Sequence, residues 1–500
     1  MVEKLTHASG TEGIEPYDPG EWLSETIDKN GLNKDFVITY QVKKDFREIC
    51  KVVQQEMDKV YNMEEKSTKD KESEWLNRQH LAVIGNTSAM AYFITRINEV
   101  LRAKNITSTN YPSYYVNLAE AIFHEVWGVS VLHKWEKYPE SEAAVIRGTE
   151  LWIDINGKFV KQKEEFASEE VVEHVKKTFT LRAKDALINE QHPELEIERE
   201  DGSRITMIQK PRSRENYVMF RRFIIKDISL EEQSRLDTIP QQDVPIYSAL
   251  SRTMPNIIIA GRVRSAKSTF MKSMIRERDK EQVIAVLEKH FELGLSKHLP
   301  DRLIFEVQAK EGDLHSSIPR LLRMEHDYIV IGEIRSIETE GFLQACERGE
   351  RGTMSTYHLT DEKHAAKQIT RHVLDEYPNR NFANELERVA RNIDIIITMD
   401  TDNRNRTKKR VTGVTEVIWD DDNDRYYTTD LIRYSKKTNK YYYNHKISNT
   451  LLRKMIDENE EETRKLVTLL KKREVQSPIS EYNKMEGNMM DFLLEVEGND

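Results

Sequence analysis

The stretch IIIAGRVRSAKST, from Ile257 to Thr269, decides the fold. It reads as an apolar strand, a turn that begins at Gly261, and a helix that opens on Lys267 and Ser268. This is close to the phosphate-binding loop G-x-x-x-x-G-K-[ST], in which backbone N–H groups and a helix N-terminus hold phosphates. Ala266 stands where the second glycine of that pattern belongs, so the stretch raises the question of whether the site works.

The loop defines a set of candidate nucleotide contacts. In such loops a lysine reaches the terminal phosphates and a hydroxyl holds Mg²⁺. We therefore predict ATP and Mg²⁺ as cofactors, with Ser268 as the Mg²⁺ ligand. The predicted nucleotide-binding residues are Gly261, Arg264, Ser265, Ala266, Lys267, Ser268 and Thr269.

The sequence around the loop alternates strands and helices from residue 254 to about residue 445. The strands read NIIIAG, QVIAVLE, LIFEVQ, YIVIGEI, GTMSTYH and IDIIITMD, and they are almost continuously apolar. Strands of this kind are typical of a parallel sheet covered by helices on both faces. The predicted fold class is therefore α/β.

A second motif, HDYIVIGEIR, places Glu333 at the end of a buried strand. We expect this strand to lie beside the phosphate-loop strand, because ligands of open α/β sheets bind at the carboxyl ends of the strands. A glutamate there can orient and deprotonate a water for attack on the γ-phosphate. The alternative is a surface glutamate that merely follows a core strand.

Changes in hydrophobic periodicity and turn signals along the chain suggest five segments. Residues 1–110 read as a polar leader and a helical extension, because Phe46, Ile49, Val53 and Met57 recur at three- and four-residue steps. Residues 111–235 read as an α+β domain, with a hairpin signal at Asn156-Gly157. We predict a linker over 236–253, the ATPase domain over 254–445, and a helical, partly disordered tail over 446–500.

Composition narrows the class of protein. The net charge of -10 argues against nucleic acid as a direct partner. The chain has two cysteines, which suggests no disulfide framework and favours a reducing compartment. The longest apolar runs are too short to span a bilayer.

Four ordered motifs between about Tyr115 and Ile456 resemble the hexameric traffic ATPases of type II and type IV secretion, type IV pili and conjugation. The likeness is closest to the CpaF-type ATPases of tight-adherence pili. LEKHFEL resembles the family's Asp box, with Glu288 matching and Lys289 in place of the aspartate. DYIVIGEIR resembles its Walker B region, and GTMSTYHL resembles its His box, with His358 at the histidine. FRRF and DGSR resemble its arginine-bearing segments. Arg221 is the first arginine of FRRF, and Arg204 is the last residue of DGSR.

The resemblance implies an α+β N-terminal domain joined flexibly to a RecA-like P-loop domain, with six copies in a ring. It implies catalytic roles for Glu333, Glu288, His358, Arg221 and Arg204, with both arginines reaching the phosphates. Glu288 would bind a Mg²⁺-held water or polarise the attacking one, and His358 would sense the γ-phosphate or serve only in packing. The implied function is an ATP-hydrolysing motor that works a pilus or secretion platform protein of the inner membrane. Such a motor is cytoplasmic and associates peripherally with the inner face of the cell membrane.

The loop departs from the family's G-G-T-G-S-G-K-T, because Arg262, Arg264 and Ala266 replace three glycines. The loop could tolerate these residues, or it could bind nucleotide weakly with two added positive charges in compensation. A third reading is a pseudo-ATPase, which would serve as a scaffold subunit of a mixed ring. Retention of Lys267, Ser268, Glu333 and His358 favours an active enzyme. A nucleic-acid motor is a further alternative, which the acidic charge disfavours.

Overall fold

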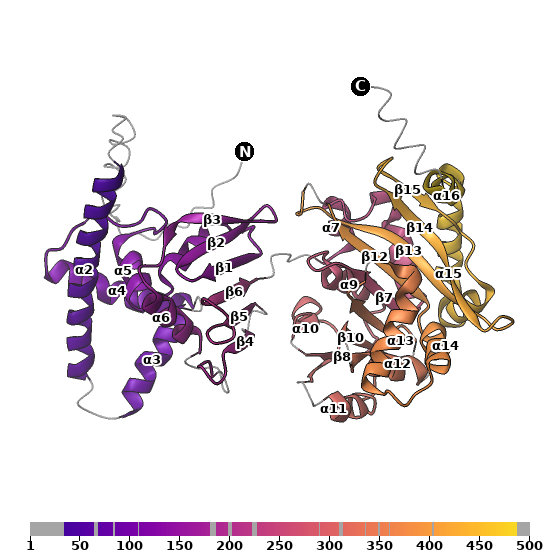
Figure 1. Ribbon diagram of the computed structural model, residues 1–500, viewed down its shortest axis with the longest axis horizontal. Helices are drawn as coiled ribbons and strands as arrows, with labels where there is room; N and C mark the ends of the chain where they lie inside the picture. Colours follow the sequence, from indigo (N-terminus) through magenta and orange to yellow (C-terminus); the bar gives the residue numbers. More distant parts are fainter. Residues whose placement is uncertain are drawn as a thin grey trace, which may run out of the picture. The chain divides into compact units, whose positions relative to one another are not determined.

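The structure, a computed structural model, describes residues 35–64, 69–83, 86–108, 110–180, 187–198, 203–222, 228–289, 291–309, 314–335, 337–348, 351–359, 361–402 and 405–487 (Figure 1). The chain forms two compact units. Apart from residues 156–158 and 198–203, which group with the second unit, the first unit ends at Arg221 and the second begins at Arg222. The polar leader expected at the start of the chain and the last residues of the expected tail lie outside the described ranges.

The first unit begins with a cluster of helices. Phe46, Val53 and Met57, which the sequence pattern places on one helix face, are all buried in an apolar cluster. The same cluster includes Phe123, so the helical region extends beyond the expected boundary at residue 110. The helices are α2 (Asp35–Glu64), α3 (Lys69–Val83), α4 (Thr87–Ala103) and α5 (Leu118–Val126), followed by the 3-10 helix η1 (Ser130–Lys137).

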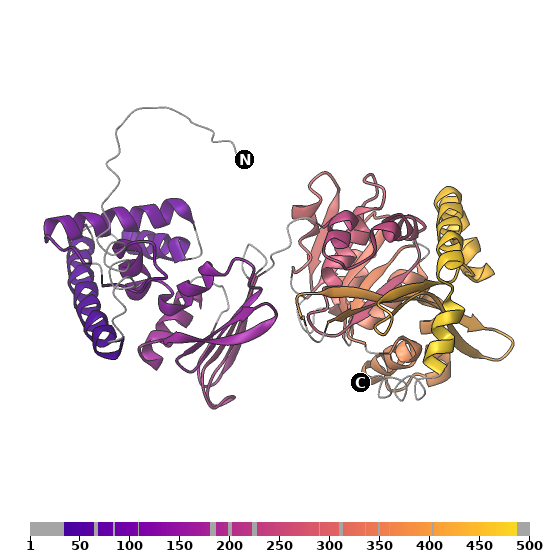
Figure 2. The same ribbon diagram turned by 90° about the horizontal axis from the view of Figure 1, so that it is seen from above.

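A six-stranded sheet completes the first unit, in the order β3-β2-β1-β6-β5-β4. Figure 2 shows α6 (Glu169–Thr180) along one face of this sheet, and its Val172, Val175 and Phe179 are buried against the strands. The hairpin predicted at Asn156-Gly157 is confirmed, since β2 and β3 flank that turn. The strands are β1 (Ala143–Arg147), β2 (Glu150–Ile155), β3 (Lys158–Glu165), β4 (Glu194–Glu198), β5 (Arg204–Ile208) and β6 (Tyr217–Arg221).

The second unit is built on a nine-stranded sheet, in the order β15-β14-β13-β12-β7-β11-β10-β8-β9. The six strands from β12 to β9 are parallel, and β13 to β15 add an antiparallel edge. The predicted α/β class is therefore confirmed. The strands are β7 (Ile257–Gly261), β8 (Ile284–Glu288), β9 (Ile304–Gln308), β10 (Tyr328–Ile334), β11 (Met354–Tyr357), β12 (Ile395–Thr401), β13 (Lys409–Asp420), β14 (Arg425–Ser435) and β15 (Lys440–Tyr443).

Helices cover both faces of the parallel strands, which explains why those strands are continuously apolar. Ile257 and Ile259 of β7 point into one apolar cluster, whereas Ile258 and Ala260 point into the other. The helical segments are α7 (Leu230–Arg235), η2 (Gln241–Asp243), α8 (Val244–Arg252), α9 (Lys267–Arg276), α10 (Leu295–His298), α11 (Leu314–Leu321), α12 (Glu338–Glu347), η3 (Glu362–His364), α13 (Ala365–Glu376), α14 (Phe382–Asn392), α15 (Asn449–Gln476) and α16 (Ile479–Gly487).

The sheet order corrects one expectation. The strand that carries Glu333, β10, is not a neighbour of the phosphate-loop strand β7, because β11 lies between them. Both pairings are parallel, so each connection crosses a face of the sheet. A parallel crossover can skip a position in the sheet, and the local sequence does not specify that choice.

The segment expected to be a linker, residues 236–253, belongs to the core of the second unit. Ile246, Tyr247 and Leu250 of α8 are buried in the same apolar cluster as the phosphate-loop strand. Two prolines and several polar residues gave this segment the composition of a linker, but Pro245 sits at the start of α8, where proline is well tolerated.

Helix α15, from the expected tail, closes the same cluster. Its Leu451, Met455, Leu466 and Leu470 pack into the core. Arg473 Nε donates to Asp243 Oδ1 at 2.9 Å, and Tyr443 donates its hydroxyl to Asp243 Oδ2 at 2.6 Å. The Asp243 side chain is 0% exposed, so a buried ion pair joins the two ends of the second unit's sequence.

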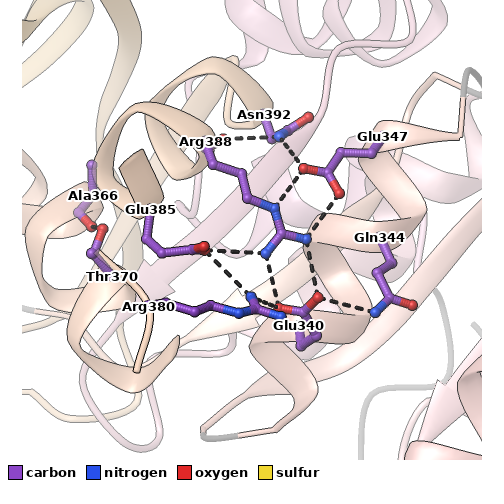
Figure 3. Close-up of polar contacts among 9 residues, drawn as sticks. All are labelled: Glu340, Gln344, Glu347, Ala366, Thr370, Arg380, Glu385, Arg388 and Asn392. Atoms are coloured by element: carbon purple, nitrogen blue, oxygen red, sulfur yellow. Dashed lines mark hydrogen bonds and ion pairs between the residues drawn. The ribbon is translucent and has the colours of Figure 1, made fainter. Parts of the chain in front are cut away.

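An ion-pair network ties α12 to α14 on the other face of the sheet (Figure 3). Arg388 donates to Glu340 Oε2 at 2.9 Å through Nη1 and to Glu347 Oε1 at 2.6 Å through Nε. Arg380 Nη1 donates to the same Glu340 oxygen at 2.9 Å, and Glu385 Oε2 also lies within reach of both guanidinium groups. The network fixes α12, α14 and the segment before α14, which carries Arg380, around one carboxylate.

Candidate nucleotide-binding site

The predicted phosphate loop connects β7 to α9. Strand β7 is buried along its whole length, and α9 begins at Lys267. Gly261 passes so close to β12 that an added Cβ would lie 2.2 Å from the Met399 carbonyl oxygen. No other residue fits there, which is why the turn must begin with glycine.

Two loop residues hold a backbone conformation that favours glycine. Arg264 has a φ of 66°, and Ala266, which caps α9, has a φ of 65° and a ψ of 26°. Left-handed backbone costs about 1–2 kcal/mol in a residue with a Cβ. Side chains hold the loop in this shape: Ser265 Oγ donates to the Arg262 carbonyl at 2.8 Å, and Thr401 Oγ1 donates to the Arg264 carbonyl at 3.3 Å.

Lys267 lies over the loop with its ammonium group inside the site. Its Nζ donates to the Arg262 carbonyl at 3.0 Å and lies 3.3 Å from His358 Nδ1. Ser268 and Thr269 follow in the first turn of α9, half-buried. The backbone N–H groups and positive end of the helix dipole there favour an anion.

Glu333 and His358 meet at the carboxyl ends of β10 and β11. His358 Nε2 lies 2.7 Å from Glu333 Oε1, and Arg335 Nη2 lies 2.8 Å from Glu333 Oε2. Burial lowers the pKa of His358, the charge of Lys267 lowers it further, and Glu333 opposes the shift. The neutral imidazole can accept from Lys267 at Nδ1, whereas Nε2 lies beside Glu333 Oε1 without a hydrogen bond, since that oxygen has no hydrogen-bond partner among the described residues.

Glu288 lies at the carboxyl end of β8, the strand beside β10. Its side chain is buried, and Oε1 accepts from the Leu293 backbone N–H at 3.0 Å. A Cβ at position 332 would lie 2.9 Å from Glu288 Cγ, so Gly332 makes room for the carboxylate. The pairing of β10 with β11 also shifts register between Ile331 and Glu333, and this irregularity sets the direction of the strand end.

Sequence reasoning missed three contributors to this group. Gly332 interrupts an apolar strand, and an isolated glycine in a strand is a known sign of a bulge or a close contact. Arg335 lies two positions after Glu333, on the same side of an extended chain. Lys272, on α9, is buried with Nζ 3.2 Å from His298 Nε2. Burial lowers its pKa, and the nearby charge of Glu288 opposes that shift, but no sequence pattern marked it.

Residues 160–476 match the family described as Type II/IV secretion system protein. The chain belongs to this family. The predicted family is thus confirmed, whereas the special likeness to CpaF-type ATPases stays a prediction. None of the helices in the described ranges is long and apolar enough to cross a membrane.

Curated relatives in the type II/IV secretion family cover part of the chain. The type IV secretion system protein PtlH of Bordetella pertussis is 26% identical over 166 residues, which are 32% of this chain and 49% of PtlH. VirB11 of Brucella abortus is 27% identical over 139 residues, 26% of this chain and 38% of VirB11. The chain thus spans half or less of the length of these relatives. The crystal structure of the Brucella suis VirB11 ATPase with sulphate is 18% identical, with a TM-score of 0.31, and the match covers 59% of this chain and 93% of that one.

The two predicted arginines of this family member lie together, but in the first unit. Arg204 of β5 and Arg221 of β6 are directly opposite each other in an antiparallel pair. Arg204 Nη1 lies 3.0 Å from Glu196 Oε1 of the neighbouring strand β4. The second unit therefore assembles the loop, Glu288, Glu333 and His358, whereas the arginines form a separate pair.

Proposed function

We propose that the protein is an ATP-hydrolysing motor of a type II/IV secretion, pilus-like or conjugative machine, acting as a hexameric ring. The observation that carries the proposal is the connected row Lys267–His358–Glu333 beside the phosphate loop. A phosphate-binding cation, a neutral imidazole and a carboxylate lie in sequence at the carboxyl edge of a parallel sheet. This is the edge at which open α/β sheets bind ligands.

Each residue has a definite task in this proposal. Backbone N–H groups of the loop and Lys267 hold the β- and γ-phosphates, and the γ-phosphate competes with the Arg262 carbonyl for the lysine ammonium. Ser268 would hold Mg²⁺ through its hydroxyl, Glu288 would bind a water on the ion, and the ion would neutralise developing phosphate charge. Glu333 orients the attacking water and takes its proton. His358 lies between Lys267 and Glu333. A γ-phosphate that moves Lys267 would therefore also move the histidine beside the general base.

Membership of the type II/IV secretion family supports the assembly part of the proposal. In a ring, Arg204 and Arg221 of the first unit would stabilise phosphate charge. The machine partner would be a platform protein at the inner face of the cell membrane, with the motor on the cytoplasmic side. The acidic charge of the chain supports a protein partner over nucleic acid.

The left-handed residues of the loop favour a second candidate, a scaffold subunit with weak or no turnover. Steady-state phosphate release by the purified full chain, with and without Mg²⁺, separates the two. The motor releases phosphate from ATP only with Mg²⁺, and light scattering gives the mass of six chains. A hexamer that binds ATP but releases no phosphate would overturn the motor and leave the scaffold.

A further inference from the structure

A compact group of metal-ligating side chains lies in the first unit, away from the phosphate loop. Glu120 and His124 are four residues apart on α5 and share one face of that helix. His133 comes from η1, the next element along the chain. One ligand atom from each of the three lies within 4.8 Å of the other two.

His124 is the unusual member of this group. It is only 4% exposed, and neither of its ring nitrogens has a hydrogen-bond partner among the described residues. A buried polar group without a partner destabilises the fold, because it has lost its hydrogen bonds to water. Its ring stacks on His133, with the centroids 4.0 Å apart and an angle of 28° between the planes. Stacking covers the faces of the two rings but gives the His124 nitrogens no hydrogen-bond partner among the described residues.

The carboxylate of Glu120 is held toward the histidines. The Asn117 side chain caps α5 by accepting from the Glu120 backbone N–H at 2.9 Å, and the Val116 backbone N–H donates to Glu120 Oε2 at 2.5 Å. The other oxygen, Oε1, lies 3.6 Å from His133 Nε2. This distance is too long for a good hydrogen bond. Glu120 Oε1 and His133 Nε2 therefore face each other without forming one.

The chemistry of the group matches a transition-metal ligand set. His124 and His133 each offer an imidazole nitrogen, the commonest protein ligand for transition metals. Two imidazole nitrogens and one carboxylate oxygen are a common three-residue set for Zn²⁺, which completes its coordination with water.

We propose that Glu120, His124 and His133 bind a Zn²⁺ ion. Ligand atoms around tetrahedral zinc lie about 3.4 Å apart, given metal–ligand distances of about 2.0–2.1 Å. The three ligand atoms lie within 4.8 Å of one another, so binding would draw the partly exposed Glu120 and His133 side chains toward His124.

The position of the site gives the ion a structural role. Ile122 and Phe123 of α5 belong to the helical cluster, whereas Leu132 and Trp135 of η1 belong to the core under the six-stranded sheet. An ion bound by α5 and η1 would hold these two apolar clusters of the first unit together. The inference is independent of ATP hydrolysis.

The test measures zinc directly on the full chain. Tag-free protein is stripped with a chelator, dialysed against Zn²⁺ and assayed for bound metal, and Co²⁺ substitution reports the coordination by its visible spectrum. We expect one Zn²⁺ per chain. The first unit of the zinc-loaded protein should also unfold at a higher temperature than that of the stripped protein. His133→Asn and Glu120→Gln change partly exposed side chains, so they avoid the folding problem of a His124 variant.

Both variants should bind zinc at least about 100-fold more weakly, since losing even an outer-sphere partner of a metal site costs about 10- to 100-fold. His174→Asn is the matched control, because His174 Nε2 is also buried with no hydrogen-bond partner in the described part of the chain but lies outside the group. The control should bind as the natural sequence does. The inference is overturned if the natural chain binds no stoichiometric zinc, or if the two variants bind it as tightly.

Discussion

At the scale of single residues, the loop departs from its family pattern at Arg264 and Ala266, where the backbone is left-handed. The loop backbone therefore has the conformation that glycines would adopt. Hydrogen bonds from the Ser265 and Thr401 side chains to loop carbonyl groups offset the energy of this conformation. Of the three residues that replace family glycines, Arg264 and Ala266 have a positive φ and Arg262 does not.

Ala266→Gly should stabilise the second unit. Relief of the left-handed conformation returns about 1–2 kcal/mol, and the greater freedom of glycine in the unfolded chain takes back about 0.5–1 kcal/mol. The expected net gain is about 0.5–1 kcal/mol in a urea titration. Ala383→Gly, at an exposed position in α14, is the control and should destabilise by about 0.5–1 kcal/mol. A loss of stability in Ala266→Gly would show that the loop is not strained there.

Glu333→Gln should remove turnover while retaining ATP. The amide keeps the shape of the side chain but cannot take a proton, so the rate of phosphate release should fall at least about 10²-fold. Binding of a fluorescent ATP analogue should change little, because Lys267 and the loop remain. Glu231→Gln, an exposed position on α7, should leave the rate unchanged. A Glu333→Gln protein that turns over at the natural rate would remove this glutamate from the mechanism.

At the scale of elements, the network around Glu340 holds α12 to α14 (Figure 3). Burial alone would raise the pKa of Glu340, but hydrogen bonds from Arg388, Gln344 and Arg380 outweigh it and lower the pKa to about 2. A carboxyl whose pKa is lower in the folded state stabilises the fold above its unfolded pKa of about 4.3. That stabilisation is lost as the pH falls from about 4.3 towards about 2.

Glu340→Gln tests this network. The variant should be less stable at pH 7 by about 2 kcal/mol, since it loses charge-assisted hydrogen bonds, and its stability should fall less steeply between pH 5 and 2. Glu387→Gln, in an exposed pair with Arg391, should cost less than about 1 kcal/mol and keep the natural pH dependence. Parallel unfolding midpoints for Glu340→Gln and the natural chain across this pH range would contradict the assignment.

Strand ends were more predictable than strand order. Apolar runs bounded by glycine and charge placed the ends of β7 and β10 correctly, because local residues determine where a buried strand stops. The position of β11 between them depends on how crossovers pack, which no short stretch encodes. The segments read as linker and tail had polar composition, yet the few apolar residues on α8 and α15 lie at positions that the core requires.

At the scale of the whole molecule, catalysis is proposed to need both units, since Arg204 and Arg221 lie in the first and the loop lies in the second. Arg221→Ala should lower phosphate release, by on the order of 10³-fold if the guanidinium acts as an arginine finger, while the ring keeps its mass in light scattering. Arg147→Ala removes a half-exposed arginine from the same sheet and should leave the rate alone. An unchanged rate in Arg221→Ala would exclude this residue from the site.

The buried pair of Asp243 and Arg473 has a consequence for synthesis of the chain. The apolar cluster that it closes draws on residues from Ile228 to Leu470, so most of the second unit must leave the ribosome before its core is complete. The first unit ends at Arg221 and does not depend on these later residues, so it can fold while translation continues. A nascent chain stalled at residue 446 should therefore resist protease in its first half and remain open to cleavage in its second. The phosphate loop would then reach its folded environment only after Leu470 has left the ribosome.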